Sequence, residues 1–298
     1  MYKKMAVLLD GSELAEVVFE YAQELAGRLH LDIELLHVCT PAESDQLPMR
    51  RAYIEQKAEM LCARAEETRR RHDGEALQAC IHARGTVACG YPAEEILNYI
   101  DENEIDLVLI STHGSSGIRA WDLGDVANKV VHASKVPVWL VPSELRDEVL
   151  ADTLPQRRLI VPLSGTKESE AVIPHVIDLI TQRAAGGEVV LVHVFDPPNY
   201  ILSRAALNAI DADRARIKEY LESVAAPMRE QGLDVSTEVL SGTAPDAIIA
   251  FLKENPSQLL AMATRGRTGF SRMIFGSVAE SLIHLIKVTP MLLVSGAE

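Results

Sequence analysis

The residues best suited to binding chemistry lie near the C-terminus, in the stretch ATRGRTGFSRMIFGSVAE from Ala263 to Glu280. This stretch holds three glycines and three arginines, and its Gly276-Ser277 pair leads into a helix-period pattern. Glycines let backbone N–H groups approach an anion closely, and the N-terminus of a helix favours negative charge. The stretch therefore predicts a phosphate-binding loop. The alternative is a turn that needs flexible residues for its shape alone.

The elements that must position this loop follow from a pattern that the chain contains twice. The apolar run and small-residue turn of MAVLLDGSELAE recur past the middle as RLIVPLSGTKESE. The runs IELLHV and VVLVHV end in the same His-Val pair, and GYPAEEILNYI matches GTAPDAIIAFL at an offset of 152 residues. The runs VPVWLVPS and TPMLLVSG close the two copies. We interpret the chain as a tandem duplication of a unit of about 150 residues.

Within each unit, apolar strand-like runs alternate with amphipathic helical patterns. This alternation predicts an α/β, Rossmann-like fold in which each half is a five-stranded, mostly parallel sheet with helices on both faces. The most charged helices are expected at roughly residues 48–73 and 205–231. The polar segment 144–156 is interpreted as a linker between domains 1–143 and 157–298. In such sheets ligands bind beyond the carboxyl ends of the strands, where the strand order reverses.

The last strand of each half predicts how the halves meet. VWLV (Val138–Val141) and MLLV (Met291–Val294) are uninterrupted apolar runs, which would be prone to aggregate as open sheet edges. We expect the two halves to pair through these strands within one chain, as a pseudo-dimer with pseudo-twofold symmetry. Further pairing of two chains into a homodimer stays open.

Composition and charge narrow the classes of partner. The 298-residue chain is 48% hydrophobic and carries a formal net charge of -14, which argues against binding to nucleic acid or to an anionic membrane. The charge is uneven, because residues 1–150 hold most of the acidic excess. The second half therefore repels a polyanion less strongly than the first. The apolar run at the N-terminus is too short for a secretory signal or a membrane span, so a cytoplasmic location is expected.

Several of these motifs together resemble the universal stress protein family. They are VLLDGSELA at strand 1, the His-Val ending of strand 2, the GYPAEEI start of a helix and the loop GRTGFSRMIFGSVAE. The resemblance covers essentially the whole chain, twice. It implies an adenine-nucleotide alpha-hydrolase-like fold, a role in the response to stress, and ATP binding through a Gly-x-x-Gly-(nine residues)-Gly-Ser/Thr pattern after strand 4.

Each half departs from that pattern at a different place. The second half keeps Gly266, Gly276 and Ser277 but has Ala263 at the first glycine, and Ser164 replaces the family's strand-1 aspartate. The first half keeps Asp10, Gly114 and Gly124, but Ser111 replaces the first glycine. In addition, Asp125 stands where Ser or Thr is expected. A carboxylate at a phosphate position repels the ligand.

We therefore expect an ATP site in the second half, with Mg²⁺ accompanying the triphosphate, and a degenerate site in the first. The second-half residues expected at the site are Val194, Ala263, Gly266, Arg267, Gly276, Ser277 and Val278. The first-half residues are Asp10, Val38, Gly114 and Gly124. The alternative is a nucleotide-free scaffold that binds a protein partner or a small apolar ligand.

The sequence offers little support for a dedicated enzyme. It lacks the S-G-G-x-D-S, G-x-x-x-x-G-K-[ST], G-x-S-x-G and H-E-x-x-H motifs, so no catalytic residue is assigned, and slow ATP hydrolysis is the most that is expected. His37 and His193 close the two second strands and are interpreted as core residues. The cysteines lack C-x-x-C spacing, and no metal site is assigned.

Overall fold

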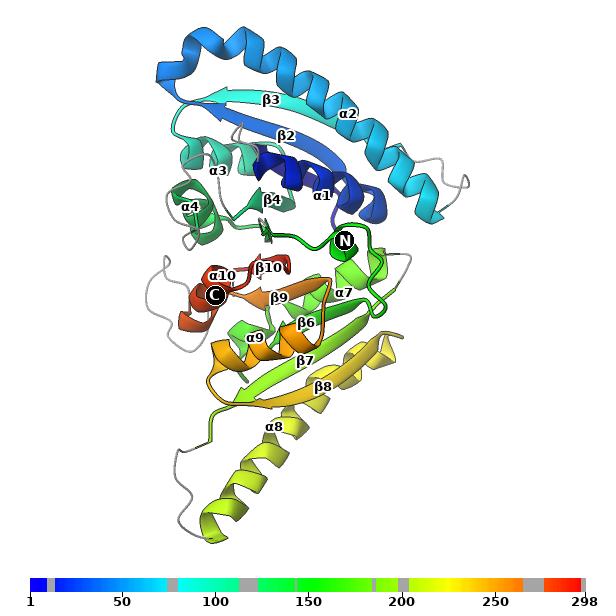
Figure 1. The fold of residues 1–298 in the computed structure, drawn as a ribbon, viewed down its shortest axis with the longest axis vertical. Helices are drawn as coiled ribbons and strands as arrows, with labels where there is room; N and C mark the ends of the chain where they lie inside the picture. The colour runs from blue at the N-terminus through cyan, green and yellow to red at the C-terminus, as the bar shows by residue number, and fades with distance from the viewer. Residues whose placement is uncertain are drawn as a thin grey trace.

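The computed structural model describes residues 1–9, 14–73, 80–112, 123–142, 144–183, 186–197, 204–264 and 276–295 (Figure 1). The first half contains β1 (Lys4–Leu9), α1 (Leu14–Leu29), β2 (Asp32–Cys39), the 3₁₀ helix η1 (Pro41–Gln46), α2 (Leu47–Asp73), β3 (Ala83–Cys89), α3 (Pro92–Glu102), β4 (Leu107–Ser111), α4 (Asp125–Ala133) and β5 (Val138–Val141). The short helix α5 (Asp147–Leu150) follows. The second half contains β6 (Arg158–Pro162), α6 (Lys167–Glu170), α7 (Ile173–Gln182), β7 (Glu188–Phe195), α8 (Arg204–Glu230), β8 (Asp234–Ser241), α9 (Ala244–Glu254), β9 (Leu259–Ala263), α10 (Ser277–Leu285) and β10 (Met291–Val294).

The strands of the described residues join one ten-stranded sheet in the order β3-β2-β1-β4-β5-β10-β9-β6-β7-β8. Within each half every pairing is parallel, and β1 pairs with both β2 and β4 as β6 pairs with β7 and β9. The predicted pair of five-stranded parallel sheets is confirmed. The strand order reverses between β1 and β4 in the first half, and between β6 and β9 in the second.

The two halves meet through their last strands, as the apolar runs predicted. β10 runs antiparallel to β5, with Trp139 opposite Leu292 and Leu140 opposite Met291. All four residues are nearly inaccessible to solvent. This single antiparallel pairing turns two sheets into one and removes both apolar edges from water.

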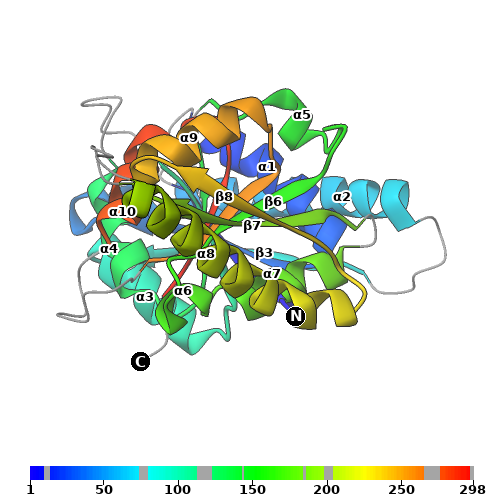
Figure 2. The same cartoon turned by 90° about the horizontal axis from the view of Figure 1, so that it is seen from below.

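Helices cover both faces of the sheet, and each face has its own core (Figure 2). Alternate residues of a strand point to opposite faces, so Met5 and Val7 of β1 enter one core and Ala6 and Leu8 enter the other. The first core includes buried residues of α1, α2, α7 and α8, and the second includes buried residues of α3, α4, α9 and α10. Both cores run through the two halves without interruption.

The helices differ between the halves in one place. Where the first half has the continuous helix α1, the second has two shorter helices, α6 and α7, with Pro174 near the start of α7. Proline cannot donate a backbone hydrogen bond, and its ring clashes with the carbonyl four residues earlier, which is that of Glu170. The helix α6 ends at this residue.

The segment predicted as a linker is packed rather than extended. It forms the helix α5, and its Val149 and Leu154 are buried in the core shared by α1 and α7. Arg28 of α1 donates a hydrogen bond to the carbonyl oxygen of Leu150. The connection between the halves therefore adds to their interface.

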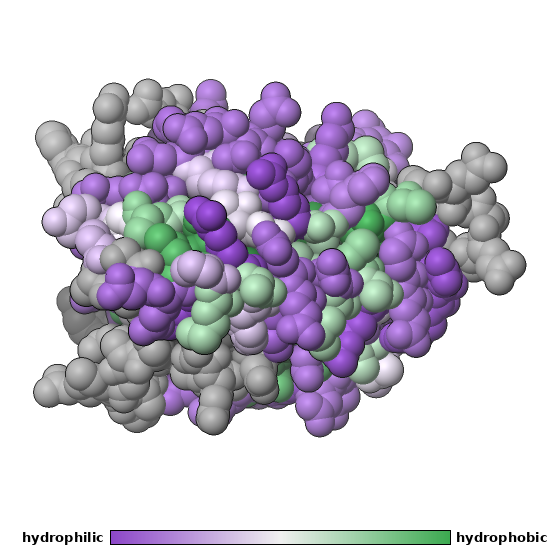
Figure 3. Space-filling model, turned by 90° about the horizontal axis from the view of Figure 1, so that it is seen from above, coloured by the Kyte–Doolittle hydropathy of each residue, from purple (hydrophilic) through white to green (hydrophobic). Residues whose placement is uncertain are grey.

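The long helices α2 and α8 lie at the two ends of the molecule (Figure 1). The end that carries α2 is mainly hydrophilic, with separate hydrophobic areas (Figure 3). Its exposed apolar side chains include Met49, Tyr53 and Met60. Among the helices described, none has the length and hydrophobicity needed to cross a membrane.

Candidate functional site

A cavity of about 340 Å³ opens at the carboxyl ends of β6, β7 and β9, where the strand order of the second half reverses. This is the position at which open parallel sheets bind ligands, and the volume falls within the range of small-molecule sites. The lining comes from three strand ends, α9 and the start of α10. It comprises Pro162, Leu163, Ser164, Ser169, Val192, His193, Val194, Ala244, Ile248, Met262, Ala263, Thr264, Gly276, Ser277, Val278 and Ala279.

The helix α10 begins at the wall of this cavity. Its N-cap is Gly276, a residue without a side chain that could cap the helix by a hydrogen bond. The N–H of Gly276 donates to the carbonyl oxygen of Thr264 at 2.8 Å, which holds the start of α10 beside the end of β9. The first N–H groups of a helix have no partner within the helix and carry partial positive charge. They form an anion-binding position at the cavity wall.

The backbone conformation at Gly276 shows why a glycine is useful at this position. Its φ of −62° and ψ of 143° are open to any residue, so the turn does not require glycine here. The missing side chain instead leaves space at the cavity wall next to the first turn of α10.

The turn after β6 forms another wall and is held by hydroxyl groups. Thr166 caps α6 by accepting from the Ser169 N–H at 3.3 Å, while the Ser169 hydroxyl donates to the Thr166 carbonyl at 2.7 Å. Ser164 lies within hydrogen-bond distance of the Thr166 hydroxyl, at 3.1 Å between the two oxygens. Gly165 has a φ of 80°, a left-handed conformation that favours glycine. Ser164 is thus presented on a rigid turn.

His193 lies on the cavity wall, and its interpretation as a core residue was wrong. Its ring meets that of Tyr220 edge to face, with the centroids 6.3 Å apart. The Tyr220 hydroxyl donates to Glu170 at 2.9 Å, and burial together with this carboxylate raises the Tyr220 pKa. By contrast, His37 is buried and its Nδ1 donates to the carbonyl oxygen of Leu9 at 2.9 Å, as a core residue should.

The first half repeats the geometry of the loop base but differs in charge. Gly124 has a φ of −56° and a ψ of 147°, and its N–H donates to the carbonyl oxygen of Thr112 at 3.2 Å. The first residue of α4 is Asp125, whereas the first residue of α10 is Ser277, and both are exposed. The two halves therefore offer the same backbone frame but place the carboxylate of the first turn differently, at the first residue Asp125 in α4 and at the fourth residue Glu280 in α10.

Most of the predicted second-half residues come together. The residues on the cavity wall are Val194, Ala263, Gly276, Ser277 and Val278, while Gly266 and Arg267 lie outside the described residues. In the first half, Val38 is half-buried against the core and Gly124 caps α4, while Asp10 and Gly114 lie outside the described residues. Ligand binding by any of them stays a prediction.

The sequence did not point to Ser169, Ala244, Ile248, Met262 or Thr264 as lining residues. Met262 and Thr264 flank the predicted Ala263 at the end of β9. Because ligands bind beyond the carboxyl ends of parallel strands, the sequence could have identified both residues. Ala244 and Ile248 come from α9, whose approach to the cavity is a matter of tertiary packing.

The cavity wall combines an apolar surface with hydroxyl groups and a helix N-terminus. Its aliphatic side chains suit a flat apolar group, and the hydroxyls of Ser164 and Ser277 can donate to or accept from a polar ligand. The Thr264 hydroxyl donates to the Val294 carbonyl oxygen and is left to accept. No Asp or Glu side chain is among the described residues that line it. The described part of the chain also contains no group of three or more His, Cys, Asp or Glu residues placed to hold a metal ion.

The fold and the cavity define an α/β protein of two Rossmann-like halves, with a candidate ligand site at the switch point of the second. The model of the universal stress protein family matches residues 1–142 and again residues 156–295, so the chain belongs to this family and carries its domain in tandem.

Relatives support this assignment. The universal stress protein YxiE of Bacillus subtilis is 26% identical over 147 residues, which cover 47% of this chain and 99% of that protein. The universal stress protein Rv2005c of Mycobacterium tuberculosis is 27% identical over 132 residues, 44% of this chain and 42% of that protein.

Two solved structures are similar to the whole chain. A universal stress protein from Archaeoglobus fulgidus has a TM-score of 0.65 at 21% identity, covering 99% of this chain and 97% of its own. A protein of unknown function from Pseudomonas aeruginosa has a TM-score of 0.66 at 14% identity, covering 99% and 93%. At these identities the likeness shows the fold alone.

Proposed function

We propose that this universal stress protein is a cytoplasmic ligand sensor or protective factor, and that its second half binds an adenine nucleotide. The observation that carries the proposal is the clustering of predicted residues in one cavity. Val194, Ala263, Gly276, Ser277 and Val278 all line it, and the N-terminus of α10 forms part of its wall.

The two ends of the cavity suit the two ends of a nucleotide. The phosphates would accept hydrogen bonds from the first N–H groups of α10 and from the Ser277 hydroxyl. The base would pack on the aliphatic wall that includes Val194 and Ile248. Ser164 would meet the ribose with a neutral hydroxyl instead of the family's carboxylate.

Charge favours the second half over the first. The described cavity wall carries no acidic side chain, and the carboxylate in the first turn of α10, Glu280, lies outside the lining, whereas α4 of the first half begins with Asp125. One site per chain is therefore expected. Mg²⁺ would enter with the triphosphate, held by its phosphate oxygens and by water, because no carboxylate or histidine cluster among the described residues is placed to bind it.

Purified protein tests the proposal directly. We expect adenine nucleotide to be released when the protein is denatured and its supernatant is run on an anion-exchange column. We also expect the unfolding temperature to rise in millimolar MgATP. Absence of released nucleotide together with an unchanged unfolding temperature would overturn the proposal and favour a nucleotide-free scaffold.

A further inference from the structure

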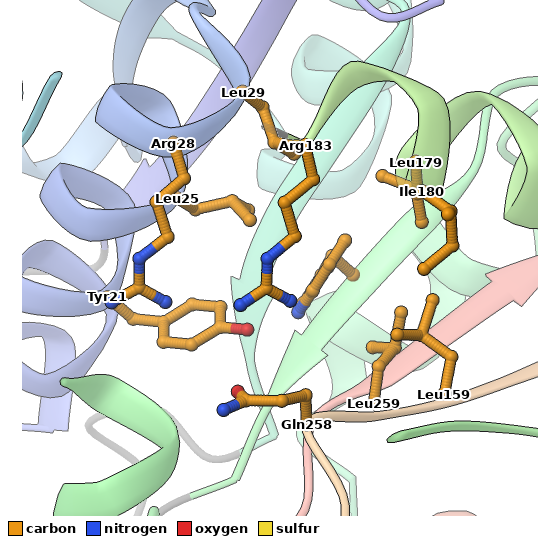
Figure 4. A pocket seen from close by; sticks show the side chains of 11 residues that line it. Tyr21, Leu25, Arg28, Leu29, Leu159, Leu179, Ile180, Arg183, Gln258 and Leu259 are labelled. Carbon is orange, nitrogen blue, oxygen red and sulfur yellow. The ribbon is translucent and has the colours of Figure 1, made fainter. Parts of the chain in front are cut away.

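A second, much smaller cavity lies at the seam between the two halves (Figure 4). Its volume is about 40 Å³, which holds a few water molecules or one small ion but no nucleotide. The wall comes from α1 and β5 of the first half and from β6, α7 and the start of β9 of the second. The lining residues are Tyr21, Leu25, Arg28, Leu29, Trp139, Leu159, Leu179, Ile180, Arg183, Gln258 and Leu259.

The polar side chains on this wall are those of Tyr21, Arg28, Trp139, Arg183 and Gln258, and no carboxylate is among them. Figure 4 shows the guanidinium groups of Arg28 and Arg183 extending toward the Tyr21 ring, with the Gln258 amide nearby. Arg28 is 7% exposed and the side chain of Arg183 is 12% exposed. Two buried guanidinium groups that face one small cavity are costly unless negative charge accompanies them.

Two carboxylates lie beside these guanidinium groups. Glu24 pairs with Arg28 at 2.7 Å, and the fully buried side chain of Asp152 pairs with Arg183 and, at 3.3 Å, with Arg157. Each guanidinium group on the wall therefore has one carboxylate, and Asp152 is shared with Arg157, whose side chain is 37% exposed and does not line the cavity. Arg71 also approaches Glu24, but its side chain is 57% exposed and is screened by water.

Donors on the wall also lack partners. The Nε2 of Gln258 and the Nε atoms of Arg28 and Arg183 have no hydrogen-bond partner among the described residues. Gln258 is only 4% exposed, so water outside the protein does not reach it freely. A buried donor left without an acceptor destabilises the folded state. An acceptor in the cavity would remove this destabilisation.

The nearby charges also make the electrostatic potential at the Tyr21 hydroxyl positive. Burial raises the pKa of Tyr21 to about 12, and the nearby charges that act most on this hydroxyl are those of Arg28 and Arg183, which lower it. Asp152 acts in the opposite direction and is a smaller influence than either arginine. The field at the Tyr21 hydroxyl is therefore net positive and suits an anion.

We propose that the seam cavity binds one small monovalent anion, of the size and charge of chloride, between Arg28, Arg183 and Gln258. The anion would accept from the unpartnered donors beside the two guanidinium groups. Because Arg28 belongs to the first half and Arg183 to the second, it would also hold the two halves together. The nucleotide-sized cavity at α10 is separate, so this inference does not depend on the proposed function.

Wild-type protein tests the proposal without any substitution. The unfolding temperature is measured as sodium chloride replaces sodium gluconate at constant ionic strength and without nucleotide. A bound anion predicts a rise that follows a single-site saturation law. In crystals grown in sodium bromide, an anomalous peak is expected between Arg28 and Arg183. An unfolding temperature that does not change when chloride replaces gluconate, or a cavity that holds water alone in the crystal, would overturn the proposal.

The variant Gln258→Leu removes one donor and keeps the charges. Its backbone N–H still donates to the Arg158 carbonyl, and leucine has a similar volume, so the fold should persist. We expect the apparent dissociation constant for chloride to rise about tenfold, the effect of losing one hydrogen bond to a charged group. The matched control is Gln231→Leu, at an exposed residue of the same half, which should leave the constant unchanged. Equal constants for Gln258→Leu and wild type would contradict the assigned position.

Discussion

Replacing Ser277 by aspartate would give the second half the residue that the first half carries at Asp125. Both positions are the first residue of a helix, follow a glycine of nearly identical backbone conformation and are exposed. Aspartate at a helix N-terminus is favourable by about 0.3–1 kcal/mol. The free energy of unfolding of Ser277→Asp should therefore equal or slightly exceed that of wild type.

Nucleotide binding should respond in the opposite direction. A carboxylate about 5 Å from a phosphate charge, at an effective dielectric constant of about 20, is repelled by about 3 kcal/mol. Water and salt reduce this value at an exposed position. We therefore expect the dissociation constant for MgATP to rise at least about tenfold, and up to about a hundredfold.

Isothermal titration calorimetry of MgATP measures this effect, with urea unfolding as the check on stability. The matched control is Asp125→Ser, which removes the carboxylate from the first half and should leave the affinity of the second half unchanged. Unchanged MgATP affinity in Ser277→Asp would refute the placement of the phosphates at α10. A variant that fails to bind because it has unfolded would be recognised by its urea curve.

Two further predictions concern the fold. Leu140 is fully buried opposite Met291 at the seam. Leu140→Ala should therefore lower the free energy of unfolding by about 2–5 kcal/mol, whereas Leu140→Met should lower it by less than about 1.5 kcal/mol. Equal losses of the two variants in urea titrations would contradict this packing. Burial alone would raise the pKa of Glu66, but hydrogen bonds from Arg69 and from the Ile81 N–H hold it below its usual value. A lowered pKa stabilises the folded state above the unfolded value of about 4.3 and loses this contribution as the pH falls below it. Glu66→Gln should therefore destabilise by about 1 kcal/mol at pH 7 and by much less at pH 3, and a pH-independent difference would argue against the ion pair.

Much of the fold could be predicted from the sequence, because apolar periodicity reports local structure. The two long helices begin and end within one residue of their expected bounds, and the parallel sheet follows from the alternation of strands and helices. The break between α6 and α7 was not predicted, although Pro174 marks it. The packing of the linker was not predicted either, since burial of Val149 depends on surfaces distant in sequence.

The candidate site likewise has features that the sequence predicted and features that it did not. The sequence by itself determined the glycine and serine at the start of α10, and the contrast between Ser277 and Asp125, because these are matters of residue type and spacing. Only the tertiary structure placed His193 on the cavity wall, brought α9 to it, and gathered Arg28 and Arg183 around the seam. The physical reason is that contacts between residues far apart in the chain depend on how helices pack across the sheet, and a local pattern carries no record of that packing.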